Sequence, residues 1–407
     1  MCDGPAMPNE RAYLDHAATT PMRPEVLDAM LPWLSSGGNP SSLHAEGRRA
    51  RAGLDDARAR VAAALGGTSR EIVFVSGGSE ADDLAIAGVL AATAGARRVV
   101  TTAVEHRAVL APVRRARDEG VEVELLPVDR DGRVQLAAYD TALERLPTLV
   151  SMMLANNEIG TVQPIAACAV QARERGVLFH CDAVQAPGRL PLDVRELGVD
   201  FLSIAAHKCY GPLGIGALYV RAGTPLRPQQ IGGSQESGRR AGTESVAAAV
   251  GFAVALELAQ AELASEAARL AELRNRFEAE VLAAVPGARA LARGVQRLPH
   301  LTAIAFPGAD AALLAIALDL AGLAVSTGSA CASGAVAGSH VLVALGDDDL
   351  AERGTVRFSF GRAQAVSDAS ALAARVAHTV AAVRDDTEQT GTRDGRTPSK
   401  AAERSVR

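Results

Sequence analysis

Short apolar segments alternate with amphipathic ones between about residues 70 and 220. The segments EIVFVS, RRVVTT, VEVELLPV, TLVSMML, GVLFHCD and FLSIAA are rich in β-branched residues and predict buried strands. The segments SEADDLAIAGVLAATAG, HRAVLAPVRRARDEG and PIAACAVQARERG carry apolar positions every three or four residues and predict helices. This alternation indicates an α/β fold, with a mostly parallel sheet that is covered by helices on both faces.

The pattern changes after Thr243, where a long helix is predicted to run to about Ala283. Beyond it, HLTAIAFPG, a helix at Ala311–Leu320, LAVSTG and GTVRFSFG indicate a smaller α+β unit, followed by a last helix at about Gln364–Val383. We expect a large domain over residues 13–255 and a small domain formed by residues 1–12 and 256–385. Residues 386–407 are polar and interrupted by Gly and Pro, and we expect a disordered tail there.

Composition narrows the class of protein. The 407 residues are 48% hydrophobic and 22% charged, and the net charge of −5 comes from interspersed acidic and basic residues. This balance gives no electrostatic case for nucleic acid as a ligand. No apolar run reaches the roughly 18 residues of a membrane span, and the N-terminal MCDGPAMPNER has no apolar signal core. We therefore expect a cytoplasmic protein without a membrane or nucleic-acid partner.

The cysteines do not form a metal or disulfide pattern. The five residues Cys2, Cys168, Cys181, Cys209 and Cys331 are irregularly spaced, and no CxxC is present. Cys181 and Cys209 do lie beside histidines, but strand alternation sends consecutive side chains to opposite faces of a sheet. We expect no metal site.

Polar residues follow several of the predicted strands. In SGGSEADD, Ser79 with Asp82 fits a helix N-cap, and the free N–H groups of such a helix start bind phosphate; a plain capped helix is the alternative. Asp182 ends the strand GVLFHCD, and Lys208 follows the next strand in AAHKCYGP. The carboxyl ends of parallel strands are where ligands bind in open α/β sheets.

Lys208 and Asp182 are costly groups to bury alone. An isolated carboxylate would protonate, whereas one that faces a cationic ring nitrogen would stay ionised. A lysine in an apolar setting is tolerated when its amine is covalently occupied. A lysine, an aspartate and a phosphate-binding helix start are together what pyridoxal phosphate needs.

Nine motifs in order carry a resemblance to a known family. They are YLDHAATTPMRPEV, SGGSEADDLAI, TTAVEHRAVL, NNEIGTVQPI, HCDAVQAPGRLPLDV, AHKCYGPLGIGALYV, RRAGTESV, STGSACASG and VRFSFGRAQ. Through them the chain resembles the cysteine desulfurases of the IscS/NifS type, in the class V branch of the fold type I aminotransferases. The resemblance covers almost the whole chain except the tail. It implies a fold type I transferase with a seven-stranded sheet in its large domain, and pyridoxal 5'-phosphate as cofactor.

The resemblance implies a role for each matching residue. Lys208 would carry the cofactor, Asp182 would pair with the ring nitrogen, and His106 would stack on the ring and move protons. Gln185 would hydrogen-bond the phenolic oxygen, near which Asn157 would lie. The remaining implied contacts are Gly78, Ser79 and His207 with the phosphate, Thr243 with the phosphate of the neighbouring subunit in a homodimer, and Arg357 with Asn157 at the substrate carboxylate.

Cys331 separates this family from ordinary aminotransferases. It lies in STGSACASGAVAG, a segment of small residues without a secondary-structure pattern, which suits a thiol that moves. The resemblance implies that Cys331 takes sulfur from L-cysteine as a persulfide and leaves L-alanine. The sulfur would pass to an acceptor protein, an Fe–S scaffold in cluster assembly or an enzyme that thiolates tRNA or another product.

Alternatives remain open at this point. A selenocysteine lyase, another class V aminotransferase or an epimerase would share the scaffold, although the cysteine in GSAC argues against them. A non-enzymatic protein with a degenerate cofactor site is a third class, opposed by the presence of the lysine, aspartate, histidine and cysteine. Ala205 stands where the family usually has a serine that binds phosphate, which predicts the loss of one hydrogen bond of about 1–2 kcal/mol.

Overall fold

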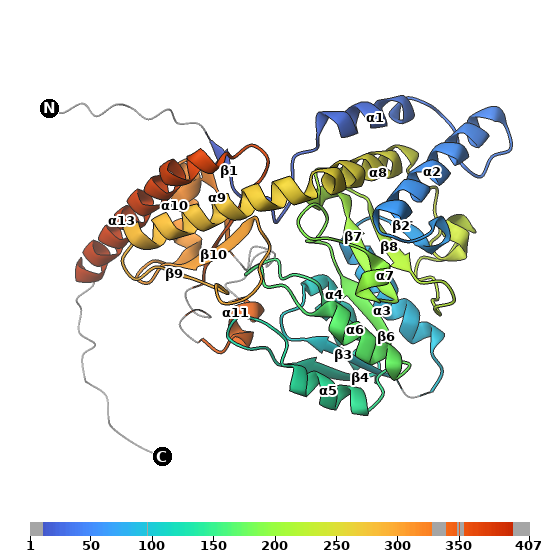
Figure 1. The fold of residues 1–407 in the computed structure, drawn as a ribbon, viewed down its shortest axis with the longest axis horizontal. Helices are drawn as coiled ribbons and strands as arrows, with labels where there is room; N and C mark the ends of the chain where they lie inside the picture. The colour runs from blue at the N-terminus through green and yellow to red at the C-terminus, as the bar shows by residue number, and fades with distance from the viewer. Residues whose placement is uncertain (1–10, 96, 328–338, 348–349, 351–353, 394–407) are drawn as a thin grey trace, which may run out of the picture.

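The computed structural model describes residues 11–95, 97–327, 339–347, 350 and 354–393. Its larger sheet has seven strands in the order β2-β8-β7-β6-β5-β3-β4 (Figure 1). Strand β8 is antiparallel to both of its neighbours, and the other pairs are parallel. The expected mostly parallel seven-stranded sheet is confirmed. The strands are β2 (Ile72–Val75), β3 (Arg98–Thr102), β4 (Glu122–Leu126), β5 (Leu149–Met153), β6 (Leu178–Asp182), β7 (Phe201–Ala205) and β8 (Gly216–Val220).

Helices cover both faces of this sheet, because successive strand residues point to opposite sides. Val150 joins the core under one set of helices, whereas its neighbour Leu149 joins the core under the other. The first set is α2 (Ala45–Ala64), α5 (Leu136–Glu144), α6 (Ile165–Glu174) and α8 (Val246–Ala261), with α1 (Pro24–Leu34) packed on α8 and the short α7 (Val194–Leu197) beside α6. The second set is α3 (Gly78–Ala92) and α4 (Arg107–Asp118). Both faces are therefore apolar, as the continuous apolar runs predict.

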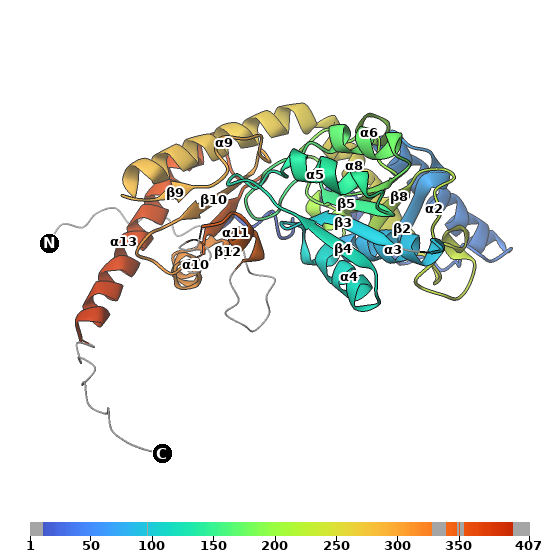
Figure 2. The same cartoon turned by 90° about the horizontal axis from the view of Figure 1, so that it is seen from below.

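A second core packs along the long helix α9 (Leu263–Ala284), away from the larger sheet (Figure 2). Three aromatic rings, Phe277, Phe358 and Phe360, pack at its centre with centroid distances of 5.0 and 5.1 Å. The elements around them are β9 (Arg289–Ala290), β10 (Leu301–Ala305), β12 (Ser326–Thr327) and β13 (Val356–Ser359) in one antiparallel sheet, β1 (Ala12–Tyr13) paired with β11 (Leu323–Ala324), and the helices α10 (Ala311–Leu320) and α13 (Ala369–Arg393). The short helix α11 (His340–Ala344) belongs to a separate apolar cluster with residues of β10. The first strand of the chain thus belongs to the C-terminal core.

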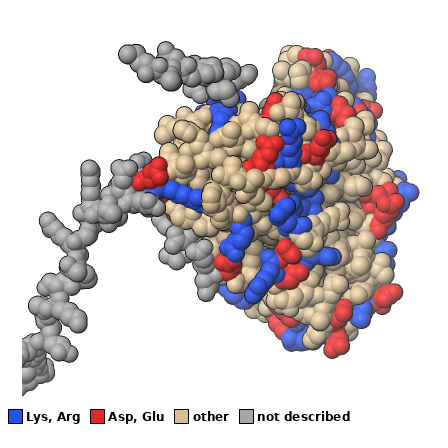
Figure 3. Space-filling view, turned by 60° about the vertical axis from the view of Figure 1, so that its left-hand side comes forward, with Lys and Arg blue, Asp and Glu red and all other residues tan. Residues whose placement is uncertain are grey.

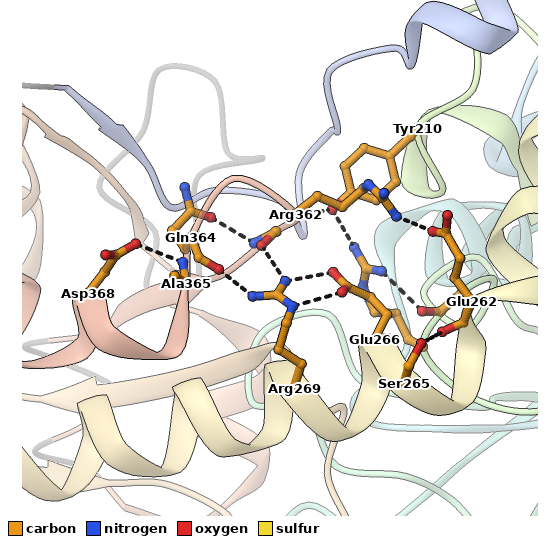
Figure 4. A network of polar contacts seen from close by, with 12 residues as sticks. Tyr210, Glu262, Ser265, Glu266, Arg269, Arg362, Gln364, Ala365 and Asp368 are labelled. Carbon is orange, nitrogen blue, oxygen red and sulfur yellow. Dashed lines mark hydrogen bonds and ion pairs between the residues drawn. The ribbon is translucent and has the colours of Figure 1, made fainter.

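The long helix predicted from Thr243 to about Ala283 is two helices instead. α8 and α9 meet at Glu262 with a bend of 71°. Glu262 accepts from Arg23 at 2.9 Å and also pairs with Arg362, while Arg269 on α9 donates to the carbonyl of Gly361 at 3.0 Å (Figure 4). These contacts hold α9 against the segment that follows β13. Helical periodicity along the sequence cannot predict the bend, because the contacts join residues far apart in the chain.

The helix predicted at Ala311–Leu320 is confirmed as α10. The last helix begins at Ala369, after a 3-10 turn at Val366–Asp368, and continues to Arg393 rather than ending near Val383. The sequence prediction ended the helix where its apolar residues end. Helix propagation adds one hydrogen bond per residue and needs no further burial once the packed part has formed.

The surface mixes charges of both signs. The face in Figure 3 shows acidic and basic side chains side by side rather than a large area of one sign. Exposed ion pairs on the described surface include Arg51 with Asp55 and Arg60 with Glu257, and pairs of this kind typically contribute only about 0–1 kcal/mol. In the part of the chain that the structure describes, no single helix is long and apolar enough to cross a membrane, and only the bent pair α8 and α9 meets that test, by length and composition alone.

Candidate functional site

The carboxyl ends of the larger sheet bring together the polar residues singled out in the sequence. Strands β5, β6 and β7 are neighbours in the sheet and run in parallel. Asn157 follows β5, Asp182 ends β6, and Lys208 follows β7. His106 follows β3 and lies close enough to Asp182 and Lys208 for both charges to act on its pKa. The predicted site is therefore one site in space, at the edge where parallel α/β sheets bind ligands.

Lys208 lies in a 3-10 turn that continues directly from β7. Its Nζ donates to the carbonyl oxygens of Ala17 at 2.6 Å and Ala18 at 2.7 Å. The chain has 42 Lys and Arg residues, of which only Lys208 and Lys400 are lysine. This scarcity is a further sequence signal for Lys208, because Arg replaces Lys wherever only a positive charge is needed, whereas a Schiff base requires an amine.

Residues 15–20 form a strap between the Lys208 turn and β13. At one end, the backbone N–H of Ala17 donates to Ser359 Oγ at 2.9 Å. At the other, the backbone N–H and Oγ1 of Thr20 donate to the carbonyl of His207 at 2.9 and 2.8 Å, and Thr20 Oγ1 accepts from the N–H of Tyr210 at 2.6 Å. These residues lie within the motif YLDHAATTPMRPEV, to which the sequence analysis assigns no role in the site.

Gln185 contacts the strap as well. Its Nε2 donates to the carbonyl of Ala17 at 2.9 Å, so one N–H of the side-chain amide is already used. The predicted contact with the phenolic oxygen of the cofactor stays a prediction. Gln185 and Lys208 share the Ala17 carbonyl, which places the amide beside the lysine amine.

Asp182 is a buried carboxylate at the end of β6. Its Oδ1 accepts from the backbone N–H of Val184 at 2.9 Å. Burial raises the pKa of Asp182 to about 6, with a further increase from Asp82 that His106 opposes. A cationic partner at the carboxylate would return the pKa to the usual range and keep the group ionised, as a pyridinium nitrogen requires.

His106 is the N-cap of α4. Its Nδ1 accepts from the backbone N–H of Ala108 at 3.1 Å, so the neutral ring carries its proton on Nε2. Burial lowers the pKa of His106, Asp182 raises it, and Lys208 lowers it further. With the proton on Nε2 and Nδ1 occupied by the Ala108 N–H, the neutral ring accepts a further proton only when Nδ1 leaves Ala108.

Arg357 on β13 is the candidate for the substrate carboxylate. It is 5% exposed, and its Nη1 and Nη2 donate to the carbonyl of Asn157 at 2.9 Å and to Asp15 Oδ1 at 2.7 Å. Its Nε is buried and has no hydrogen-bond partner among the described residues. The side chain of Asn156, which accepts from the N–H of Glu158 at 2.8 Å, shapes the turn that presents the Asn157 carbonyl. A donor left over in a buried guanidinium suits an anionic ligand.

The expected phosphate site needs one correction. Ser79 is not an N-cap paired with Asp82: Gly77 is the N-cap of α3, and Ser79 lies within the first turn. A side chain at Gly77 would meet open space, whereas a Cβ at Gly78 would approach Val184 to 2.6 Å. The helix start thus leaves room for an anion above Gly77, as the N-terminus of a 15-residue helix favours.

His207 and Thr243 complete the predicted phosphate contacts. His207 is half-buried, and burial with the nearby Lys208 lowers its pKa to about 4. Thr243 is exposed. Arg240, three residues earlier, pairs with Glu80 of the same chain at 2.8 Å, so the segment leading to Thr243 approaches the first turn of α3. The contact of Thr243 with a neighbouring subunit stays a prediction.

The described cysteines are poor nucleophiles. Cys168, Cys181 and Cys209 are buried free thiols, and burial raises the pKa of all three, to about 12 for Cys168 and Cys209. A thiol reacts as its thiolate, so these three are inert at neutral pH. Cys2 and Cys331 lie outside the described residues. Within the described ranges no cluster of three or more metal-ligating side chains occurs.

A buried polar layer supports the site from within the sheet. His180 contacts Ser151 Oγ through Nδ1 at 2.8 Å and Ser203 Oγ through Nε2 at 2.9 Å. Asp82 lies 3.5 Å from the same Nε2, and burial raises its pKa to about 7. Sequence reasoning missed this layer, because a histidine and two serines on adjacent strands show no pattern along the chain.

Glu105 belongs to the same interior. Its Oε1 accepts from Thr102 Oγ1 at 2.6 Å and from the N–H of Met153 at 3.0 Å, and burial raises its pKa to about 8. The unfolded chain loses this proton near pH 4, so between pH 6.5 and 8 the folded state binds the extra proton. The contribution of Glu105 to the free energy of unfolding should therefore fall as pH rises through this window.

We expect Glu105→Gln to remove a slope of roughly 1 kcal/mol per pH unit from the stability of the cofactor-free protein between pH 6.5 and 8. The buried histidines have lowered pKa values and are neutral in the folded protein, whereas in the unfolded chain they are still partly protonated near pH 6.5. They add a slope of opposite sign that wild type and variant share, so the difference between the two slopes isolates Glu105. Urea unfolding at several pH values measures the slope, with Glu257→Gln on the surface as control. A variant slope equal to that of the wild type would contradict this account.

The residues present fit pyridoxal phosphate. The start of α3 suits a phosphate. Burial raises the pKa of the Asp182 carboxylate, and a cationic ring nitrogen would supply the partner that keeps this group ionised. Lys208 offers its amine at the same edge of the sheet, after β7. Ala205, the last residue of β7, is buried and offers no hydroxyl. The expected loss of one phosphate hydrogen bond at this position stays a prediction.

Comparisons with known proteins agree with this reading. The class V aminotransferase family model matches residues 12–372. The cysteine desulfurase IscS of Dictyoglomus turgidum is 45% identical over 351 residues, which make up 86% of this chain and 89% of that protein. A cysteine desulfurase of Cereibacter sphaeroides is 47% identical over 353 residues, 86% of this chain and 90% of that one. A solved NifS-like protein aligns with a TM-score of 0.85 at 32% identity, covering 91% of this chain and 99% of its own. The chain therefore belongs to the class V aminotransferase family, among the cysteine desulfurases of the IscS/NifS type.

Proposed function

We propose that this protein is a pyridoxal phosphate-dependent cysteine desulfurase, which converts L-cysteine to L-alanine and a persulfide on Cys331. One observation carries the proposal: Lys208, Asp182 and His106 meet at the carboxyl edge of the sheet in a chain that is 45% identical to a cysteine desulfurase. Selenocysteine lyase, another class V aminotransferase and an epimerase are the competing activities.

Each residue has a defined task in this reaction. The bound cofactor withdraws electrons from the amino acid, which acidifies its Cα–H and weakens its Cβ–S bond. Lys208 holds the cofactor and, once released by substrate, moves the Cα proton. Arg357 binds the substrate carboxylate, and His106 accepts the thiol proton once its Nδ1 leaves the Ala108 N–H.

Cys331 is the proposed sulfur acceptor. Its thiolate attacks the substrate sulfur, so an S–S bond forms as the Cβ–S bond breaks, and the bonding pair stays with the carbon fragment. Protonation of that fragment gives alanine, and Cys331 keeps the sulfur as a persulfide. A dithiol or an acceptor protein then takes the sulfur from Cys331, which restores the thiol.

The direct test is to incubate the cofactor-loaded protein with L-cysteine and a dithiol and to quantify alanine and sulfide. We expect equal amounts of both, formed over many turnovers. L-Serine, which lacks the sulfur, should give neither product. Turnover of L-selenocysteine without turnover of L-cysteine, or formation of a keto acid instead of sulfide, would favour one of the competing activities.

We further propose a homodimer with Thr243 at the phosphate of the neighbouring subunit. The exposure of Thr243 supports this, as does a hollow of about 640 Å³ whose lining includes Met22 and Leu213, both exposed. Large exposed apolar side chains favour burial against a partner. A monomeric mass by light scattering would contradict the dimer.

The sulfur acceptor we propose is an Fe–S scaffold protein or a thiolation enzyme, as the desulfurase family implies. The compartment we propose is the cytoplasm, because Cys168, Cys181 and Cys209 are free thiols, which reducing compartments preserve. Co-purification after chemical crosslinking of the persulfide form tests the acceptor, and cell fractionation tests the compartment.

A further inference from the structure

The Arg357 guanidinium is held by two protein acceptors before any substrate arrives. Nη1 donates to the carbonyl of Asn157 at 2.9 Å, and Nη2 donates to Asp15 Oδ1 at 2.7 Å. Nε has no partner among the described residues although the side chain is only 6% exposed. The guanidinium is therefore fixed through one N–H of each terminal nitrogen, and its other N–H groups, including the buried Nε–H, are left for a ligand.

Asp15 is itself fixed by the backbone on both sides. It forms a parallel bridge with Ser359 on β13, and the N–H of Ser359 donates to the carbonyl of Leu14 at 2.8 Å. The Tyr13 hydroxyl donates to the carbonyls of Asp15 at 3.1 Å and Thr19 at 2.9 Å, which closes the strap on itself. The Asp15 carboxylate thus has little freedom to follow a moving guanidinium.

Asp15 also supplies the counter-charge that a buried guanidinium requires. A buried charge without a partner is strongly unfavourable. Glu158 is a second acidic group near Arg357, and burial raises its pKa to about 7, so it is only partly ionised at neutral pH. Asp15 is the acidic group in direct contact with the guanidinium, at 2.7 Å from Nη2.

The same strap reaches the lysine. Ala17 and Ala18, two and three residues after Asp15, accept from Lys208 Nζ. The strap thereby sets the distance between the amine that carries the cofactor and the guanidinium that binds the substrate carboxylate. Such spacing decides how an amino acid lies over a catalytic lysine.

We propose that Asp15 is a positioning residue of the carboxylate site, which orients the Arg357 guanidinium so that its remaining N–H groups meet the carboxylate of the amino acid. This inference rests on the proposed function, because it takes an amino acid as the ligand. Asp15 acts through Arg357 and does not touch the substrate.

The test compares ligands with and without a carboxylate on the cofactor-loaded protein. The visible absorbance change on binding gives dissociation constants for L-alanine and L-alaninamide, for wild type, Asp15→Ala and Asp15→Asn. We expect Asp15→Ala to weaken L-alanine binding by about 10-fold or more, because breaking a buried, charge-assisted contact releases the guanidinium. L-Alaninamide binding should change by less than about 2-fold, since it lacks the group that Arg357 holds.

Two further variants sharpen the result. Asp15→Asn keeps an oxygen acceptor for Nη2 without the charge, so it should recover part of the L-alanine affinity. Asp55→Ala, which removes an exposed carboxylate paired with Arg51 at 3.0 Å, is the matched control and should match the wild type. With L-cysteine, Asp15→Ala should raise KM far more than it lowers kcat.

Two outcomes would overturn the proposal. Equal weakening of L-alanine and L-alaninamide would show a general structural role, and thermal unfolding of each variant shows whether the fold has been lost. Tighter L-alanine binding by Asp15→Ala would show that Asp15 competes with the substrate for Arg357. The binding comparison needs no turnover, so a wild type that binds L-alanine but releases no sulfide refutes the proposed function and still tests Asp15.

Discussion

Replacing Cys331 with alanine is expected to lower the rate at which alanine and sulfide form from L-cysteine by about 100-fold or more, while the protein keeps its cofactor. The reaction needs a thiolate that accepts sulfur. Each of the three described cysteines is buried with a raised pKa, so none of them replaces Cys331. Cys331 has no predicted contact with the cofactor, so the visible spectrum of the loaded protein should be that of the wild type.

The measurement pairs product analysis with mass spectrometry of the intact protein. Wild type exposed to L-cysteine without reductant should gain one sulfur atom, and the peptide that carries it should contain Cys331. Cys168→Ala is the matched control, because Cys168 lies in the core on α6 and its thiol is inert. Full turnover by Cys331→Ala, or loss of turnover in Cys168→Ala with its fold intact, would refute the assignment.

Replacing Lys208 with alanine is expected to remove covalent cofactor binding and to lower turnover by about 1,000-fold or more. In the structure, the Lys208 amine donates to two main-chain carbonyls of the strap at 2.6 and 2.7 Å, and alanine deletes these hydrogen bonds together with the charge that they satisfy. We therefore expect the variant to fold and to keep the phosphate contacts at α3.

The chain offers an unusually clean readout for this prediction. Only Lys208 and Lys400 are lysines, so borohydride reduction followed by peptide mass spectrometry has two possible attachment points. The cofactor should be found on the Lys208 peptide alone, and Lys400→Ala should load and turn over like the wild type. Cofactor on Lys400, or full activity in Lys208→Ala, would exclude the proposed role.

Much of the fold was predictable because each element has its own period. The strands from β2 to β7 are short β-branched runs, and α10 begins and ends where its apolar positions do. The polar ends of these strands were visible for the same reason, since Asp182 and Lys208 interrupt apolar runs. Parallel order then places such residues at one edge.

The remaining features depend on contacts that local pattern does not encode. The bend between α8 and α9 is held by Glu262 with Arg23 and Arg362, which lie far from it in sequence. The N-cap at Gly77 could not be predicted from a capping side chain, because glycine has none. The space beside Gly77 is empty instead of holding a capping oxygen. The pairing of Asp15 with Arg357 required the position of β13 in the C-terminal core.

The strap has a consequence for how the protein is made. Asp15 and Arg357 are 342 positions apart, and the ribosome adds residues from the N-terminus, so Lys208 emerges long before Arg357 does. Contacts that close such long loops form late in folding. Until β13 has been made, the strap has no strand to pair with, and the strap carbonyls that accept from the Lys208 amine are not yet held in place. Completion of the carboxylate site, and with it the capacity to select an amino acid, therefore comes late in synthesis, after β13 has been made.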